Sequence, residues 1–366
     1  MAKLKDIAAA LKADLTGDGE LVVEGLNHPT AAGPRDLALA LEDSALSALG
    51  GTAARAAILR RGTEAPAGLA AVLTVDHPRY ALAGLTRFFA NTPHATKGIH
   101  PSAVVDPSAV VEEPASIGPF VQIGPGARIG RGAVVLGHVT IGAYARIGAE
   151  ALLHPGVRIG ERVEIGDRVI LHHNVSIGAD GFSFAIPEPG SPPPADSPRV
   201  ARIASLGTVI LGPDVEVGAN SCIDRGNIEA TVIGAGTKID NLVMIGHNNQ
   251  IGEGCLIAGR VGISGSCRIG NRVILAGGVG IADHITIGDD AVVLAGAQVG
   301  SNRIAPGAVV IGMPAMPRDK FFEQVRYMFR LKRIFTDVAE IKRRLGMSPA
   351  PGDSGDASAG DGAKDT

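Results

Sequence analysis

The chain has 366 residues, a formal net charge of −3 and 45% hydrophobic residues. This charge gives no overall attraction to nucleic acid, and no stretch approaches the roughly 18 consecutive apolar residues that a membrane-spanning helix needs. The N-terminus shows no signal-peptide pattern, and the three cysteines show no C-x-x-C spacing. We therefore expect a cytoplasmic protein without a transmembrane segment or a nucleic-acid partner.

The first part of the chain, residues 1–98, alternates helical and extended patterns, as in a small α/β domain. We predict helices over 4–13 and 80–90, and strands over 20–26, 56–61 and 70–76.

A six-residue repeat dominates residues 99–316. An aliphatic residue recurs at every sixth position from Val105 to Ile177 and again from Ile233 to Val299, followed in phase by Ala305 and Ile311. Gly often comes directly after it, as in Ile117-Gly118. Repeats of this length are the mark of a solenoid.

A period of six fits neither an α-helix nor one long alternating strand. It fits a coil of three short strands, with the aliphatic residue inward on each face, a small residue at each corner, and coils stacked about 4.8 Å apart. The low aromatic content of 3% and the 50 glycines agree with narrow interior layers. We predict a mainly β protein built on a left-handed parallel β-helix, and regard a β-sandwich with coincidental spacing as the alternative.

Two breaks interrupt the repeat. Residues 179–208 contain a proline cluster that cannot lie in a central strand, so we predict an excursion loop there. Ile223 and Ile233 are ten residues apart, so the segment DRGNIEAT should bulge from its coil.

The C-terminal segment 317–346 places apolar residues three and four positions apart, which predicts amphipathic α-helices. Nine basic and four acidic residues between positions 318 and 345 give it a net charge of +5. Such a surface can bind an acidic partner, although it can also be an ordinary solvated face. Residues 347–366 have the composition of a disordered tail.

Polar residues that depart from the repeat are the candidates for chemistry, and the densest group lies in IDNLVMIGHNNQIG, with Asp240, His247 and Asn248. His247 and His284 follow inward residues that are 36 positions apart, which is two coils. The stacked three-sided coils form a triangular prism, and both histidines should project from one edge of it, about 10 Å apart along its axis. A general base with a second substrate contact is one interpretation, and solvated surface histidines are the other.

Two further features have alternative interpretations. His154 and His172 are one coil apart and could hold zinc between subunits. No third possible ligand lies at the corresponding position of another coil, which favours a row of histidines stacked on the surface. Asp180 and Phe182 begin the excursion loop and could cover a ligand or simply form a turn.

With these residues in view, the chain resembles the UDP-3-O-acylglucosamine N-acyltransferases of lipid A biosynthesis nearly from end to end. The resemblance rests on GADGF at 178–182, IDRG at 223–226, IDN at 239–241, GHNNQIG at 246–252 and His284 after GGVGIAD. It implies a homotrimer that moves an (R)-3-hydroxyacyl group from acyl carrier protein to the 2-amino group of a UDP-amino sugar, UDP-3-O-(3-hydroxyacyl)glucosamine. It implies no metal and no free cofactor, and the basic C-terminal helices would bind the carrier protein.

Carried over by motif, the catalytic histidine of the family falls on His247 and the second site histidine on His284. His247 would act as the general base in a direct attack of the amine on the thioester, with backbone N–H groups near the coil edge stabilising the oxyanion. Asp240 could orient His247 across a subunit boundary. The further substrate-binding candidates are Asn248, Asp180 and Phe182.

The chain departs from the family at the residues that hold uracil. Where members place an aromatic residue, Asn and a second aromatic residue, this sequence has Leu39, Glu42 and Ala45. The nucleotide sugar would then be held differently or be a different sugar, such as a diamino sugar. Two other hypotheses stay open at this point: a zinc lyase like the β-helical carbonic anhydrases, and a non-catalytic trimeric scaffold.

Overall fold

The computed structural model describes residues 1–90, 95, 97–300, 303–312 and 317–347. The chain divides into two compact units, residues 1–94 and 95–366. The disordered tail predicted at the C-terminus lies outside the described residues, apart from its first position. No helix within the described ranges is both long and apolar enough to cross a membrane.

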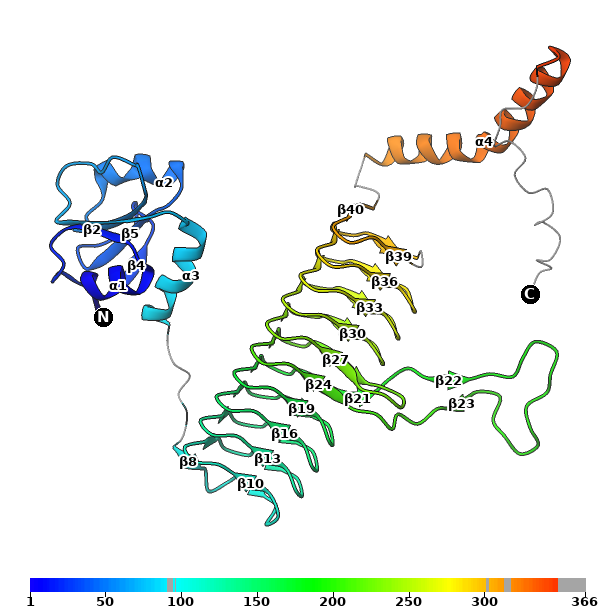
Figure 1. Ribbon diagram of the computed structural model, residues 1–366, viewed down its shortest axis with the longest axis horizontal. Helices are drawn as coiled ribbons and strands as arrows, with labels where there is room; N and C mark the ends of the chain where they lie inside the picture. Colours follow the sequence, from blue (N-terminus) through cyan, green and yellow to red (C-terminus); the bar gives the residue numbers. More distant parts are fainter. Residues whose placement is uncertain (91–94, 96, 301–302, 313–316, 348–366) are drawn as a thin grey trace. The chain divides into compact units, whose positions relative to one another are not determined.

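The N-terminal unit is a five-stranded sheet with helices on both faces (Figure 1). The sheet order is β2-β7-β6-β5-β4, with β2 antiparallel to β7 and the other pairs parallel. The elements in chain order are β1 (Ala2–Lys3), α1 (Leu4–Leu11), β2 (Asp14–Gly17), β3 (Val22–Val23), β4 (Gly25–Asn27), β5 (Asp36–Ala40), α2 (Asp43–Ser47), the 3-10 helix η1 (Ala48–Gly51), β6 (Ala56–Arg60), β7 (Ala71–Val75) and α3 (Pro78–Phe89).

Helices α1 and α3 pack on one face of this sheet, where Leu4 and Leu85 meet Ile58 in a fully buried cluster. Helix α2 and η1 cover the other face, where Ala45 and Leu49 are buried. Strand β5, which the sequence prediction missed, is buried on both faces, so its apolar residues do not alternate with polar ones.

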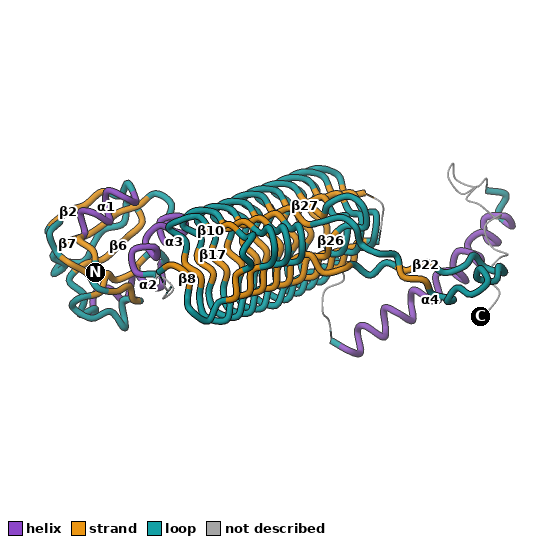
Figure 2. Tube along the Cα trace, turned by 90° about the horizontal axis from the view of Figure 1, so that it is seen from below, coloured by secondary structure: helices purple, strands orange, loops and turns teal. Residues whose placement is uncertain are grey.

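The second unit is a parallel β-helix with three sheets, each named here by its first strand (Figures 1 and 2). The β8 sheet contains β8 (Gly98–Ile99), β11 (Ser116–Ile117), β14 (Val134–Val135), β17 (Leu152–Leu153), β20 (Ile170–Leu171), β25 (Glu216–Val217), β28 (Lys238–Ile239), β31 (Leu256–Ile257), β34 (Ile274–Leu275), β37 (Val292–Val293) and β40 (Val309–Val310). The β9 sheet contains β9 (Val104–Val105), β12 (Gln122–Ile123), β15 (Thr140–Ile141), β18 (Arg158–Ile159), β21 (Ser176–Asp180), β26 (Cys222–Arg225), β29 (Met244–Ile245), β32 (Gly262–Ile263), β35 (Gly280–Ile281) and β38 (Gln298–Val299). The β10 sheet contains β10 (Val110–Val111), β13 (Arg128–Ile129), β16 (Arg146–Ile147), β19 (Glu164–Ile165), β24 (Val209–Leu211), β27 (Thr231–Ile233), β30 (Gln250–Ile251), β33 (Arg268–Ile269), β36 (Thr286–Ile287) and β39 (Arg303–Ile304).

The strand register confirms the repeat and corrects its end. Residues 18 positions apart are paired, as Ile117 is with Val135, so each inward aliphatic residue stacks on its counterpart one coil away. In the last coil the paired residues are Ile304 and Val310. The prediction that Ala305 and Ile311 continue the inward positions is therefore wrong. The last coil is one residue shorter than the others, and its strand in the β10 sheet directs Ile304, which is larger than Ala305, inward.

The glycine that follows the inward residue has a different role from the one expected. A Cβ at Gly118 would lie 2.9 Å from the backbone nitrogen of Gly137 in the next coil, so Gly is needed there because the coils approach closely. The left-handed conformation occurs two positions later, where non-glycine residues such as Phe120, Asn248 and His284 have φ values of 57°, 61° and 58°.

The excursion loop leaves the prism after β21 and carries a short antiparallel hairpin of β22 (Phe184–Ala185) and β23 (Ala201–Arg202), visible in Figure 1. The C-terminal segment forms one helix, α4 (Arg318–Arg344), rather than the several helices expected. None of the described residues of α4 is buried, and most of its apolar side chains are exposed.

Candidate active site

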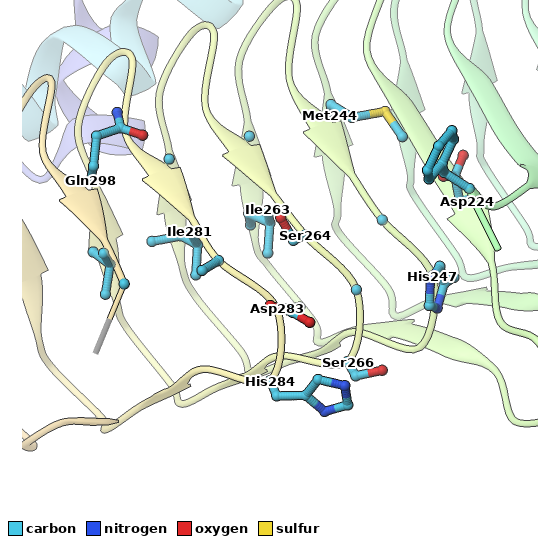
Figure 3. Close-up of a pocket in the computed structure, with 18 residues that line it drawn as sticks. Asp224, Met244, His247, Ile263, Ser264, Ser266, Ile281, Asp283, His284 and Gln298 are labelled. Carbon is cyan, nitrogen blue, oxygen red and sulfur yellow. The ribbon is translucent and has the colours of Figure 1, made fainter. Parts of the chain in front are cut away.

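A groove of about 720 Å³ runs along the outer face of the β9 sheet, from β29 to β38 (Figure 3). The outward positions of these strands are Met244, Gly262, Gly280 and Gln298. Gly262 leaves open space above the floor, whereas the side-chain amide of Gln298 extends over Gly280. The corners that follow the strands form one wall, and Phe182 and Asp224 line the groove near β29.

His247 lies in the corner after β29, half-buried, with its imidazole enclosed by two glycines. A methyl group at Gly265 in the next coil would lie 2.7 Å from Cε1 of His247, and one at Gly181 in the excursion loop would lie 2.9 Å from Cδ2. Any larger residue at either position would displace the ring. The loop and the neighbouring coil therefore fix its position together.

Asn248 determines which nitrogen of His247 carries the proton. Its Oδ1 accepts the backbone N–H of Asn227 at 3.0 Å, so the atom that faces the ring is an acceptor. The same oxygen lies 3.0 Å from Nδ1 of His247, which must therefore donate. In the neutral imidazole this leaves the lone pair on Nε2, as a general base requires.

Asn227 also joins this hydrogen-bond network to the excursion loop. Its side-chain amide donates to Oγ of Ser183 at 2.8 Å, beside Phe182. The backbone N–H of Asn248 donates to Oγ1 of the buried Thr231 at 2.8 Å. The bulge after β26, which appeared in the sequence only as a break in phase, thus supplies the residue that connects the loop root with the histidine corner.

His284 lies two coils further along the same groove, as the spacing of 36 residues predicts (Figure 3). Its backbone N–H donates to the carbonyl of Gly265 at 3.1 Å, and its side chain is exposed. The structure thus brings His247, His284 and Phe182 to one groove, whereas Asp180 is exposed beside it and is paired with Arg202 at 2.7 Å.

Asp240 lies on another sheet, after β28, and lines a second groove of about 760 Å³ with His172, Glu216 and Lys238. Its Oδ1 accepts the backbone N–H of Asn241 at 2.7 Å. Within one chain Asp240 therefore does not contact His247, and any role in orienting that histidine requires a second chain.

Sequence reasoning missed Asp224, which has an exposed fraction of 4% and lines the groove of His247. Burial raises its pKa to about 6, although the nearby His247 partly offsets this effect. The sequence feature that could have identified Asp224 is its place in the IDRG motif, where the six-residue repeat is interrupted.

The histidine ladder lies along the β8 sheet as a stack of imidazole rings. The rings of His154 and His172 are 5.1 Å apart and nearly parallel, and Nε2 of His172 lies 2.9 Å from Glu216. Burial and the adjacent histidines lower the pKa of His154. No group of three or more His, Cys, Asp or Glu side chains among the described residues is arranged to hold a metal ion.

The positions that correspond to the uracil contacts present no aromatic surface. Leu39 is half-buried in β5, Ala45 is buried in α2, and only Glu42 is exposed.

Comparison with known proteins identifies a family model and several relatives that match this chain. The bacterial transferase hexapeptide model (six repeats) matches residues 120–155 and 144–179. A UDP-3-O-acylglucosamine N-acyltransferase from Paracoccus denitrificans is 52% identical over 263 residues, covering 68% of this chain and 71% of the relative. One from Ruegeria pomeroyi is 47% identical and covers 68% and 72%. The solved structure of an Arabidopsis UDP-N-acetylglucosamine acyltransferase, 23% identical, covers 58% of this chain and 71% of its own with a TM-score of 0.52, and shows the same fold.

Proposed function

Because the chain belongs to the UDP-3-O-acylglucosamine N-acyltransferase family and is an N-acyltransferase of lipid A biosynthesis, we propose its donor, acceptor and mechanism. The donor is an (R)-3-hydroxyacyl thioester of acyl carrier protein, and the acceptor is the 2-amino group of UDP-3-O-(3-hydroxyacyl)glucosamine. The observation that carries this proposal is the enclosed imidazole of His247, with Nδ1 directed to Asn248.

His247 acts as the general base. The amine attacks the thioester carbonyl, Nε2 of His247 takes a proton from the attacking nitrogen, and the imidazolium returns that proton to the leaving thiolate. The backbone N–H of Gly265 would stabilise the oxyanion, since it has no acceptor among the described residues and belongs to the glycine that packs against the imidazole. His284 is a second substrate contact further along the groove.

The groove floor suits an acyl chain. Gly262 and Gly280 carry no side chains, so the strip between Met244 and Gln298 is open above Gly262 and covered above Gly280 by the amide of Gln298. An apolar chain laid across this strip would be held by backbone and aliphatic contacts. The role of Phe182, exposed at the groove margin, is to cover the bound ligand.

A homotrimer completes the site. The groove of the β9 sheet is open to one side, while the β8 sheet presents the second groove with the exposed apolar side chains of Leu256 and Ile274. Packing the β9 sheet of one protomer against the β8 sheet of the next would bury both surfaces and bring Asp240 toward His247 of the neighbour. Sedimentation of the purified protein as a trimer is expected, and a monomer would argue against the shared site.

Helix α4 is the proposed contact for the acidic carrier protein. The cationic side chains of Arg330 and Lys332 are exposed, and the segment 318–345 carries nine basic against four acidic residues. Opposite charge would accelerate the encounter of the two proteins.

The test is amide formation by the purified protein from hydroxyacyl carrier protein and a panel of UDP-amino sugars, followed by mass spectrometry. The panel includes a diamino sugar, because Leu39, Glu42 and Ala45 replace the expected uracil contacts. His247→Ala should lower kcat by about 10²–10⁴-fold. No amide with any acceptor, or full activity of His247→Ala, would reject the proposal.

A further inference from the structure

Asp224 is a buried carboxylate with an oxygen that no described residue satisfies. Its exposed fraction is 4%, and it lines the groove of His247. The thiol of Cys222 donates to Oδ1 over 3.6 Å, a weak hydrogen bond. Within the described ranges Oδ2 has neither a hydrogen bond nor an ion pair. Every fully buried side-chain oxygen of the described chain has a hydrogen-bond partner, so Oδ2 must be partly accessible from the groove.

The two arginines near Asp224, Arg225 and Arg202, are bound to other groups. The guanidinium of Arg225 donates to the carbonyl oxygens of Gly178 and Glu161, at 2.8 Å and 3.1 Å. Arg202 pairs with Asp180 at 2.7 Å. Nδ1 of His247 is directed to Asn248. A buried carboxylate whose partner is only the weak thiol donor of Cys222 is costly, so this arrangement fits a site whose cation arrives with the ligand.

The other carboxylate that lines the groove has a different environment. Asp283 is exposed, two coils from β29. Water can solvate its charge, which weakens its attraction for a cation. Asp224 and His247 line the same groove near β29, so a group bound at this end of the groove can contact both (Figure 3).

We propose that Asp224 binds the amino group of the acceptor as an ammonium ion and takes its first proton. This inference rests on the proposed function. An alkylammonium ion has no lone pair, so one N–H proton must leave before attack, and Asp224 accepts it to become a neutral carboxylic acid. The free amine then forms the C–N bond while His247 takes the second proton, the C–S bond breaks, and the imidazolium protonates the thiolate. Asp224 releases its proton to water when the amide leaves.

Because this role depends on the charge of the acceptor, it makes Asp224 the residue that favours an amine over a hydroxyl group at the attacking position. A 2-hydroxy analogue of the acceptor, UDP-3-O-acylglucose, has the same shape without the positive charge. Calorimetry should show that the wild-type protein binds the amino sugar at least about tenfold more tightly than this analogue, as expected for a buried charged hydrogen bond. In Asp224→Asn the two ligands should bind equally.

Asp283→Asn is the matched control, since it removes one carboxylate charge from the same groove. It should keep the preference for the amino sugar. Retained preference in Asp224→Asn, with amide formation by the wild type, would overturn this inference and leave the proposed function intact. Absence of amide from the wild type would instead reject the proposed function.

A second measurement covers the case in which Asp224→Asn does not fold. The wild-type protein is titrated with acceptor labelled with 15N at the amine, and the nitrogen shift is followed by NMR across pH. Binding beside an anionic carboxylate should raise the apparent pKa of the amine. An unchanged or lowered value would contradict the proposal.

Discussion

Oδ1 of Asn248 lies 3.0 Å from Nδ1 of His247, although the two residues are adjacent in the chain. The left-handed φ of 61° at Asn248 allows this contact between neighbouring side chains at a corner. The Asn227 N–H, which also donates to Oδ1, fixes the direction of the amide. The bond therefore selects one imidazole tautomer.

Asn248→Ala should lower kcat by about 10–100-fold, because Nδ1 loses its acceptor and the reactive tautomer is no longer selected. Asn220→Ala is the control for backbone strain, since Asn220 has a φ of 58° at the same position of another corner. Equal activity of the two variants would show that Asn248 has no part in positioning His247.

Asn248→Asp should retain the acceptor and add a negative charge beside the imidazole. The added charge should favour the imidazolium over the neutral ring. Since the neutral ring is the base, the rising limb of the profile of kcat/KM against pH should move to higher pH. A shift to lower pH would contradict this account.

Gly265→Ala should reduce kcat without unfolding the protein. The new methyl group would lie 2.7 Å from Cε1 and 2.8 Å from Nε2 of His247, so the ring must move. Gly277→Ala is the matched control at the same place in another repeat, where the nearest atom is 3.6 Å away. Steady-state kinetics and circular dichroism of both variants provide the test. Full activity of Gly265→Ala would show that catalysis does not require the imidazole of His247 to be held in this position.

His284→Ala should act mainly on KM. The side chain of His284 is exposed and lies two coils from the base, so its loss should lower kcat/KM by about tenfold and leave the pH profile unchanged. A fall in kcat as large as that of His247→Ala would assign His284 to proton transfer instead.

Asp224→Asn should stabilise the unliganded protein at pH 7. Asp224 faces His247, Asp180 and Cys222, and its pKa of about 6 lies above the ordinary value of 3.8 for an aspartate. Between these values the folded state binds more protons than the unfolded state, so stability falls as pH rises. The penalty at pH 7 is about 3 kcal/mol at most. Thermal unfolding should show a higher Tm for Asp224→Asn at pH 7 and little difference at pH 3, whereas a lower Tm at pH 7 would indicate a structural role.

The sequence alone determined the coil. A six-residue period allows few folds, because each inward aliphatic residue must stack on one 18 positions away, as Ile245 does on Ile263. From that period followed the placement of His247 and His284 along one groove. The same reasoning placed the excursion loop, since prolines cannot join a central ladder.

Only the tertiary structure decided what surrounds His247. Asp224 lies in β26 and Asn227 in the bulge that follows it, where the six-residue period is interrupted, so the repeat could not place their side chains. The enclosure of the ring by Gly181 and Gly265 depends on how closely the loop and the next coil approach, a distance that spacing does not encode. Asp240 lies only seven residues before His247 yet belongs to another sheet, because a corner separates them. Periodicity specifies the position of a residue along and around the prism, whereas the contacts of its side chain depend on segments that leave the repeat.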